Sequence, residues 1–179
     1  MTDEAALTRW FDWDPSRLLR DVDELAVIAP DLLRRTPEGE FLANGGWVGT
    51  LPLWPFDRPA PPNLDALLPN PMSVVITYPS AYPMLPPRVY PTEPQPAILE
   101  VSDTVWHVSP GGSLCLFQSD GMWDPSASIG DIVLKSAGWR IEYELMHRGA
   151  IARMTERGIV TDTHLDYLVV EQAKQAAEE

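Results

Sequence analysis

The chain has 179 residues, 45% of them hydrophobic and 22% charged, which is the length and composition of one globular domain. Thirteen Lys and Arg residues against 26 Asp and Glu give a formal net charge of −13, which disfavours nucleic acid and anionic lipid as partners. No apolar run reaches the roughly 18 residues of a membrane span. The acidic start and the single cysteine are typical of a soluble protein of the reducing cytoplasm.

Helix signals come first along the chain. Asp14 is a suitable N-cap, Pro15 suits the first helical position, and apolar residues follow at helical spacing, so we expect a helix that Pro30 ends or kinks. Thr2, which two acidic residues follow, indicates a short helix before it.

The middle of the chain carries strand and loop signals. Gly45–Gly46, between the apolar stretches of residues 40–53, predicts a hairpin of two short strands. Six prolines in residues 55–71 predict an ordered loop without a helix or strand. β-branched and compact segments predict three further strands, the first of them buried, over residues 72–78, 88–90 and 97–101.

The region after Val101 is rich in Gly, Pro, Ser and Asp. This composition predicts irregular structure held by Trp106 and Trp123. A second long helix is expected to begin after Ser128 and to stop at Gly149.

The C-terminal region predicts two more helices. The first covers residues 150–157, and the second follows Thr163 and Asp166, which have the spacing of a capping pair. The order of helix, strands, loop and helices predicts an α+β fold. We expect one domain over the whole chain, with a core of about residues 14–147 and a helical C-terminal extension over 150–179.

Cys115 is the starting point for any chemistry. A lone intracellular cysteine is most often a small buried residue. Here Gly111 and Gly112 precede it and Gly121 follows it, so the thiol is expected in an exposed, turn-rich loop, with His107 eight residues upstream. One cysteine and three scattered histidines show no spacing of metal ligands, so no metal is expected.

Two sequence blocks frame this cysteine. Residues 78–89 read Tyr-Pro-x-x-Tyr-Pro-x-x-Pro-Pro-Arg-Val, and residues 112–116 read Gly-Ser-Leu-Cys-Leu, followed by Trp123 and Pro125. In their order and separation the two blocks resemble the ubiquitin-conjugating enzyme family, and the similarity extends over about residues 14–147.

The resemblance implies a fold and an activity. The fold is a ubiquitin-conjugating-enzyme-like domain with an N-terminal helix, an antiparallel meander sheet, an active-site loop and C-terminal helices. The activity is a transferase without cofactor: Cys115 takes the C-terminus of a ubiquitin-like protein from an activating enzyme as a thioester and passes it to an amine of a protein acceptor.

Two positions depart from the family pattern. The family's His-Pro-Asn is absent, and His107 stands near the position of its Asn, so His107 is a candidate oxyanion donor. The alternative is that His107 only holds the loop through backbone hydrogen bonds. Phe117 stands where many members have Asp; Asp120 and Asp124 are the nearest replacements, although a turn or cap explains each of them equally.

The region after the second helix also lacks the proline-rich crossover of eukaryotic members. This points to a divergent bacterial branch, some of whose members occur in antiphage defence operons, where a cyclic-nucleotide synthase is one candidate acceptor. Two other functions stay open: an inactive binding module of the same fold, and a cysteine hydrolase that uses Cys115 with His107 or His147.

Lysine is rare in the chain. Lys135 and Lys174 are the only two, and Lys135 falls within the second long helix. Limited self-modification is therefore expected of a thioester carrier, although a genome that favours arginine would give the same composition.

Overall fold

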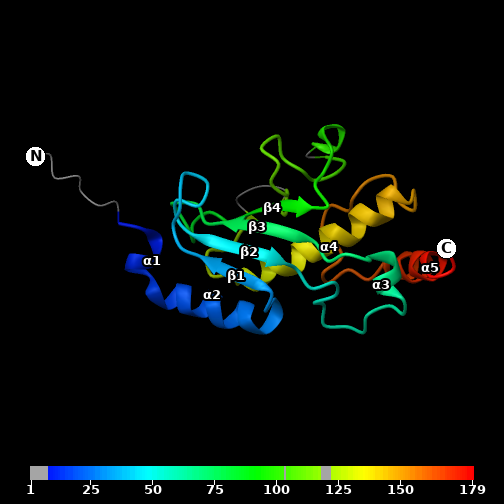
Figure 1. Ribbon diagram of the computed structural model, residues 1–179, viewed down its shortest axis with the longest axis horizontal. Coiled ribbons are helices and arrows are strands. Elements are labelled where there is room, and N and C mark those ends of the chain that lie inside the picture. The colour runs from blue at the N-terminus through cyan, green and yellow to red at the C-terminus, as the bar shows by residue number, and fades with distance from the viewer. Residues whose placement is uncertain (1–7, 103, 118–121) are drawn as a thin grey trace, which may run out of the picture.

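The computed structural model describes residues 8–102, 104–117 and 122–179 (Figure 1). These residues form an α+β fold around a four-stranded antiparallel sheet in the order β1-β2-β3-β4. The strands are β1 (Leu32–Arg35), β2 (Gly46–Thr50), β3 (Ser73–Thr77) and β4 (Arg88–Glu93). The helices are α1 (Trp10–Trp13), α2 (Pro15–Ile28), α3 (Leu64–Leu67), the 3-10 turn η1 (Ile98–Glu100), α4 (Ile129–His147) and α5 (Asp166–Ala176).

The predicted N-terminal helix is confirmed as α2. The Asp14 side chain accepts a hydrogen bond from the Arg17 backbone N–H, Pro15 occupies the first turn, and the helix ends at Ile28, ahead of Pro30. The helix expected to start at Thr2 falls outside the described residues. Trp10, in α1, is buried and fixes the start of the fold against the sheet.

The predicted hairpin at Gly45–Gly46 is wrong. Gly46 begins β2 and pairs with Arg35 and Thr77 on its two sides, so residues 36–45 form the connection between β1 and β2. A Cβ atom on Gly46 would lie 2.0 Å from the Ile76 carbonyl oxygen. The glycine therefore permits a close approach of two strands and does not make a turn.

The strands β3 and β4 are confirmed, but two other predictions for the middle of the chain are wrong. Residues 55–71 include α3, in which Leu64 and Leu67 are buried against α5. Residues 97–101 form no strand, because the Glu100 carboxylate accepts the Ala97 backbone N–H at 2.7 Å and closes the turn η1.

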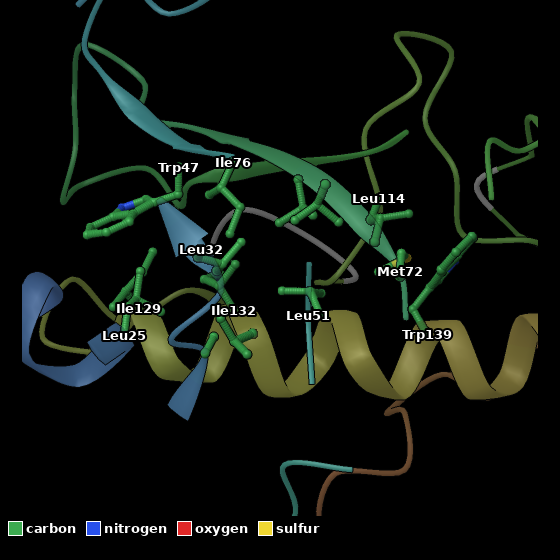
Figure 2. Close-up of a cluster of buried hydrophobic side chains, with 14 of the residues drawn as sticks. Leu25, Leu32, Trp47, Leu51, Met72, Ile76, Leu114, Ile129, Ile132 and Trp139 are labelled. Atoms are coloured by element: carbon green, nitrogen blue, oxygen red, sulfur yellow. The ribbon is translucent and has the colours of Figure 1, made fainter. Parts of the chain in front are cut away.

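Helix α4 organises the core. Figure 2 shows it beneath the sheet, with Ile129 and Ile132 pointing toward β-strand side chains such as Ile76. Its other face buries Ile141 and Leu145 against the second apolar cluster, to which α3 and α5 contribute. In Figure 1 these two short helices lie together at the end of the molecule opposite α1.

The ends of α4 agree with the sequence. The Ser128 side chain accepts the Gly130 N–H, and the chain leaves the helix through Gly149 at φ +70°. None of the described helices has both the length and the apolar character that crossing a membrane requires.

The predicted helix over residues 150–157 is wrong. This segment turns back beside α4 in an irregular conformation: the Met154 N–H donates to the Val105 carbonyl at 3.1 Å, and Met154 is buried. The last helix is confirmed as α5, but Asp166 does not act as a capping partner, because its carboxylate forms an ion pair with Arg58 at 2.9 Å.

Two leucines of α2 give a matched test of the core. We predict that Leu25→Ala, where 1% of the side chain is exposed, lowers the free energy of unfolding by about 2–5 kcal/mol because it leaves a cavity between α2 and α4. Leu19→Ala, at a side chain that is 65% exposed, changes it by no more than about 0.5 kcal/mol. Denaturant titration of both variants measures the difference, and equal losses would contradict this packing.

Candidate active site

The loop around Cys115 is a short hairpin. Val108 and Leu114 form an antiparallel bridge, and the Cys115 backbone N–H donates to the His107 carbonyl at 2.8 Å. Ser109 and Ser113 close the loop, since the Ser109 N–H donates to the Ser113 carbonyl at 2.8 Å. The backbone alone therefore brings Cys115 beside His107.

This hairpin is attached to the sheet. The Leu114 N–H donates to the Val89 carbonyl of β4 at 2.8 Å, and the side chains of Val108 and Leu114 are buried in the main core. Cys115 follows Leu114 directly, so the attachment of this loop to β4 fixes its position.

Cys115 is partly buried and lies between two pockets. The larger, of about 770 Å³, is also lined by His107, and the smaller, of about 350 Å³, by the proline-rich residues 86–87. Leu116 and Phe117 line both pockets, so the Cys115 segment forms the wall between them. Residue 115 therefore borders both spaces.

Trp123 packs against the segment that carries Cys115. Its side chain is buried, its indole N–H donates to the Pro83 carbonyl at 2.7 Å, and its ring meets the Phe117 ring edge-on at 5.6 Å. The tryptophan therefore connects the Cys115 segment to the proline-rich block of residues 78–89.

His107 adopts a left-handed conformation with φ +51°, which is rare for a residue with a side chain. Its carbonyl holds the Cys115 N–H while its imidazole lines the larger pocket. Both roles considered for His107, a brace for the loop and a donor to the oxyanion, are compatible with this geometry.

The structure describes one of the two acidic candidates, Asp124. Asp120 lies outside the described residues. Asp124 accepts hydrogen bonds from the Ser126 N–H and hydroxyl, both at 2.8 Å, and these bonds lower the pKa of its carboxyl group. Asp124 is not among the described residues that line either pocket, so its geometry is that of a turn.

The tyrosines of the first block have a clear structural role. The hydroxyls of Tyr78 and Tyr82 both donate to Asp21 Oδ2, at 2.8 and 2.9 Å, and the Trp47 indole N–H donates to the Tyr78 hydroxyl at 2.9 Å. Asp21 is fully buried on α2; burial raises the pKa of its carboxyl group, and the two tyrosine hydrogen bonds oppose this rise. The sequence signal for this buried carboxylate is the position of Asp21, which falls on the apolar stripe of the helix between Leu18 and Leu25.

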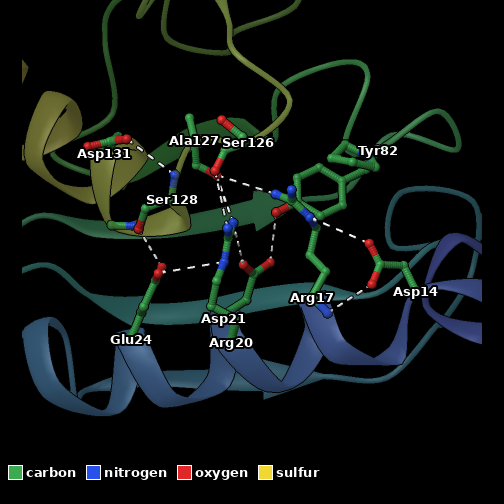
Figure 3. A network of polar contacts seen from close by, with 12 residues as sticks. Asp14, Arg17, Arg20, Asp21, Glu24, Tyr82, Ser126, Ala127, Ser128 and Asp131 are labelled. Carbon is green, nitrogen blue, oxygen red and sulfur yellow. Dashed lines mark hydrogen bonds and ion pairs between the residues drawn. The ribbon is translucent and has the colours of Figure 1, made fainter.

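Two arginines of α2 hold the chain that leads from Trp123 into α4. Figure 3 shows Arg17 and Arg20 reaching toward this segment, and Arg20 Nη2 donates to the Ala127 carbonyl at 2.8 Å. Arg17 donates to the carbonyls of Pro125 and Ala127. Helix α2 thus stabilises both ends of the candidate site, through Asp21 and through these arginines.

The C-terminal segment contributes unexpected residues to the larger pocket. Arg153, Thr155 and Arg157 line it together with Cys115 and with Lys135 of α4. The Lys135 ammonium lies 5.2 Å from the centre of the Phe117 ring. We expected a helical C-terminal extension over residues 150–179, and no spacing in the sequence indicates that this segment returns to the cysteine.

His147 belongs to a different cluster. Its Nε2 lies 2.9 Å from the Glu100 carboxylate, and its ring packs against Trp106 at 5.3 Å. It is not among the described residues that line the Cys115 pockets, so the arrangement does not pair it with the thiol.

Comparison of the chain with known proteins gives no assignment. A scan against protein-family models found no match, and a search of curated proteins found none either. Within residues 8–102, 104–117 and 122–179, no group of three His, Cys, Asp or Glu side chains has the arrangement of a metal site.

The position of Cys115 leads to a labelling prediction. We expect iodoacetamide to modify the folded protein once, at Cys115, because the thiol borders two pockets. Intact-mass spectrometry before and after denaturation measures the reaction, with Cys115→Ser as the control. Modification that occurs only after unfolding would contradict an accessible thiol.

Proposed function

We propose that the chain is a ubiquitin-conjugating-enzyme-like transferase. Cys115 accepts the C-terminal acyl group of a ubiquitin-like protein from an activating enzyme as a thioester and passes it to an amine of a protein acceptor. The proposed setting is the cytoplasm of a bacterium, in antiphage defence, with a cyclic-nucleotide synthase as one candidate acceptor. The helix, meander sheet, cysteine loop and following helix α4 occur in the order of the family's fold, which supports this proposal.

The observation that carries the proposal is the place of Cys115 in a wall between two pockets. In a transfer reaction, the carbonyl carbon of the passenger stays on sulfur while an amine attacks it. The new C–N bond forms, the C–S bond breaks, and the thiolate leaves. Space on both sides of the sulfur allows the passenger and the acceptor to be present together.

A donor for the oxyanion is the second requirement of this chemistry. We take His107 as the candidate, because this residue lines the same pocket as Cys115. The carbonyl of His107 already holds the Cys115 N–H, so the residue also serves as a brace. The two roles are separable by mutation, because only the first depends on the imidazole.

A binding module of the same fold is the second candidate function. It is favoured by Asp124, whose carboxylate is engaged by Ser126 and not directed to the thiol, and by the missing His-Pro-Asn. A cysteine hydrolase would depend on His107, because His147 pairs with Glu100, away from Cys115.

Reconstitution separates these functions. The purified protein is incubated with an activating enzyme, ATP and a ubiquitin-like protein from the same genome, and is examined on gels with and without reductant. We expect an adduct that reductant removes and that Cys115→Ser replaces with a reductant-resistant ester. No adduct would favour the binding module, and release of free passenger without transfer would favour the hydrolase.

Self-modification is the main confounding reaction, because Lys135 lines the same pocket as Cys115. Lys135→Arg keeps the charge and removes the acceptor amine. We expect the reductant-sensitive adduct to be unchanged in this variant. A reductant-resistant adduct that maps to Lys135 would contradict the expectation of limited self-modification.

His107→Ala tests the imidazole. If the imidazole donates to the oxyanion, loading of Cys115 stays near normal while discharge to an amine slows on the order of 10² to 10³. Single-turnover discharge of the preformed thioester, with a thermal melting curve beside it, measures both effects. Unchanged discharge in a folded variant would leave His107 with the backbone brace as its only role.

A further inference from the structure

The chain that follows α4 forms one wall of the larger pocket. Residues 153–158 line it together with the Cys115 segment and with Lys135 and Trp139 of α4. In Figure 1 this segment, in orange, turns back from the end of α4 before it reaches α5. The pocket therefore combines the thiol with a surface that lies outside the region of family resemblance.

A buried carboxylate fixes this wall. Glu142 of α4 is 2% exposed, and it accepts the Thr155 backbone N–H at 2.6 Å and the Thr155 hydroxyl at 2.8 Å. Met154 is held beside Thr155 by the Val105 carbonyl. Arg153 and Arg157 stand two residues on either side of this fixed point, so the clamp determines where both side chains begin.

The charge of the pocket differs from that of the chain. Among its described lining residues are three cations, Lys135, Arg153 and Arg157, and two carboxylates, Glu142 and Glu156. Both oxygens of Glu142 accept hydrogen bonds from Thr155, so this carboxylate is held on the protein side, and the cations of the lining outnumber the carboxylates by one. The chain has 26 acidic residues and 13 basic ones. Three of the basic residues nevertheless line the pocket beside its one cysteine.

We propose that this pocket binds an acidic, extended peptide segment: the residues that precede the C-terminal residue of the passenger carried on Cys115. This inference rests on the proposed transferase function. With the terminal carbonyl at the sulfur, the preceding side chains lie among Lys135, Arg153 and Arg157, where carboxylates form charge-assisted hydrogen bonds. Thr104 and Ser109 line the same space, and the Ser109 hydroxyl is already paired with the Ser113 hydroxyl at 2.8 Å.

The size of the pocket favours a peptide over a small anion. Its volume of about 770 Å³ lies within the roughly 300–1,000 Å³ of ordinary ligand sites. It is continuous with the thiol, as a tail joined to sulfur requires. A site for phosphate or a free amino acid needs neither this volume nor contact with Cys115.

Binding of unreactive peptides tests the inference. Fluorescent peptide amides that end in Gly-Gly are prepared with three preceding residues that are acidic (Asp-Glu-Asp), neutral (Asn-Gln-Asn) or basic (Lys-Arg-Lys). Polarisation titrations at 50 and 200 mM NaCl give their affinities for the full chain. We expect the acidic peptide to bind about tenfold more tightly than the neutral one, with a difference that shrinks at the higher salt concentration.

Matched variants locate the binding. Lys135→Gln and Arg153→Gln each weaken the acidic peptide by about two- to fivefold, as expected for partly exposed ion pairs, and the triple variant with Arg157→Gln removes the preference. Lys174→Gln on α5 and Arg34→Gln on β1 are the controls: each removes one positive charge outside the pocket. We expect both to leave the preference for the acidic peptide unchanged. Melting curves verify that each variant is folded.

Three results would overturn the inference: equal binding of acidic and neutral peptides, an acidic preference that the triple variant retains, or displacement of the peptide by phosphate or free aspartate at the peptide's own concentration. Because the peptides cannot react, these results are independent of thioester formation. Absence of the reductant-sensitive adduct would instead refute the proposed transferase and leave the peptide preference as a property of a binding module.

Discussion

The burial of α4 on two opposite faces is the constraint on which the candidate site depends. One face, with Ile132, closes the main core under the sheet, and the other, with Ile141, closes the cluster formed with α3 and α5. The chain after α4 returns along this helix and supplies part of the second cover through Ile159 and Val169. Glu142 holds it there through Thr155, and the same helix presents Lys135 to the pocket of Cys115. The position of the C-terminal segment is thus a consequence of core packing.

Polar contacts place the cysteine loop within this frame. The buried carboxylate of Asp21 joins α2 to Tyr78 and Tyr82, and Arg20 joins the same helix to the segment that enters α4. A buried carboxylate is costly unless donors satisfy it, so the Tyr-Pro-x-x-Tyr-Pro block has a structural reason as well as a family likeness. Trp123 completes the frame by tying the Cys115 segment to Pro83.

Local signals predicted local structure well and long-range structure poorly. The caps at Asp14 and Ser128 act within one turn, so they located α2 and α4 correctly. Gly46 was misassigned to a turn because its role, a close approach to Ile76, depends on a strand thirty residues away. The loop position of Cys115 followed from its glycine-rich neighbours. The return of Arg153 and Arg157 to its pocket depends on the Glu142–Thr155 contact, which no spacing in the sequence predicts.

The central claim is that Cys115 carries a ubiquitin-like protein, bound through that protein's C-terminus as a thioester, from an activating enzyme to an acceptor. The most direct measurement is the intact mass of Cys115→Ser purified from the cells that encode it, because an ester on serine survives where a thioester turns over. The account predicts an added mass the size of a small protein, released by hydroxylamine and mapped to residue 115. Recovery of the variant only in unmodified form, while the host's own conjugates are present in the same cells, would contradict it.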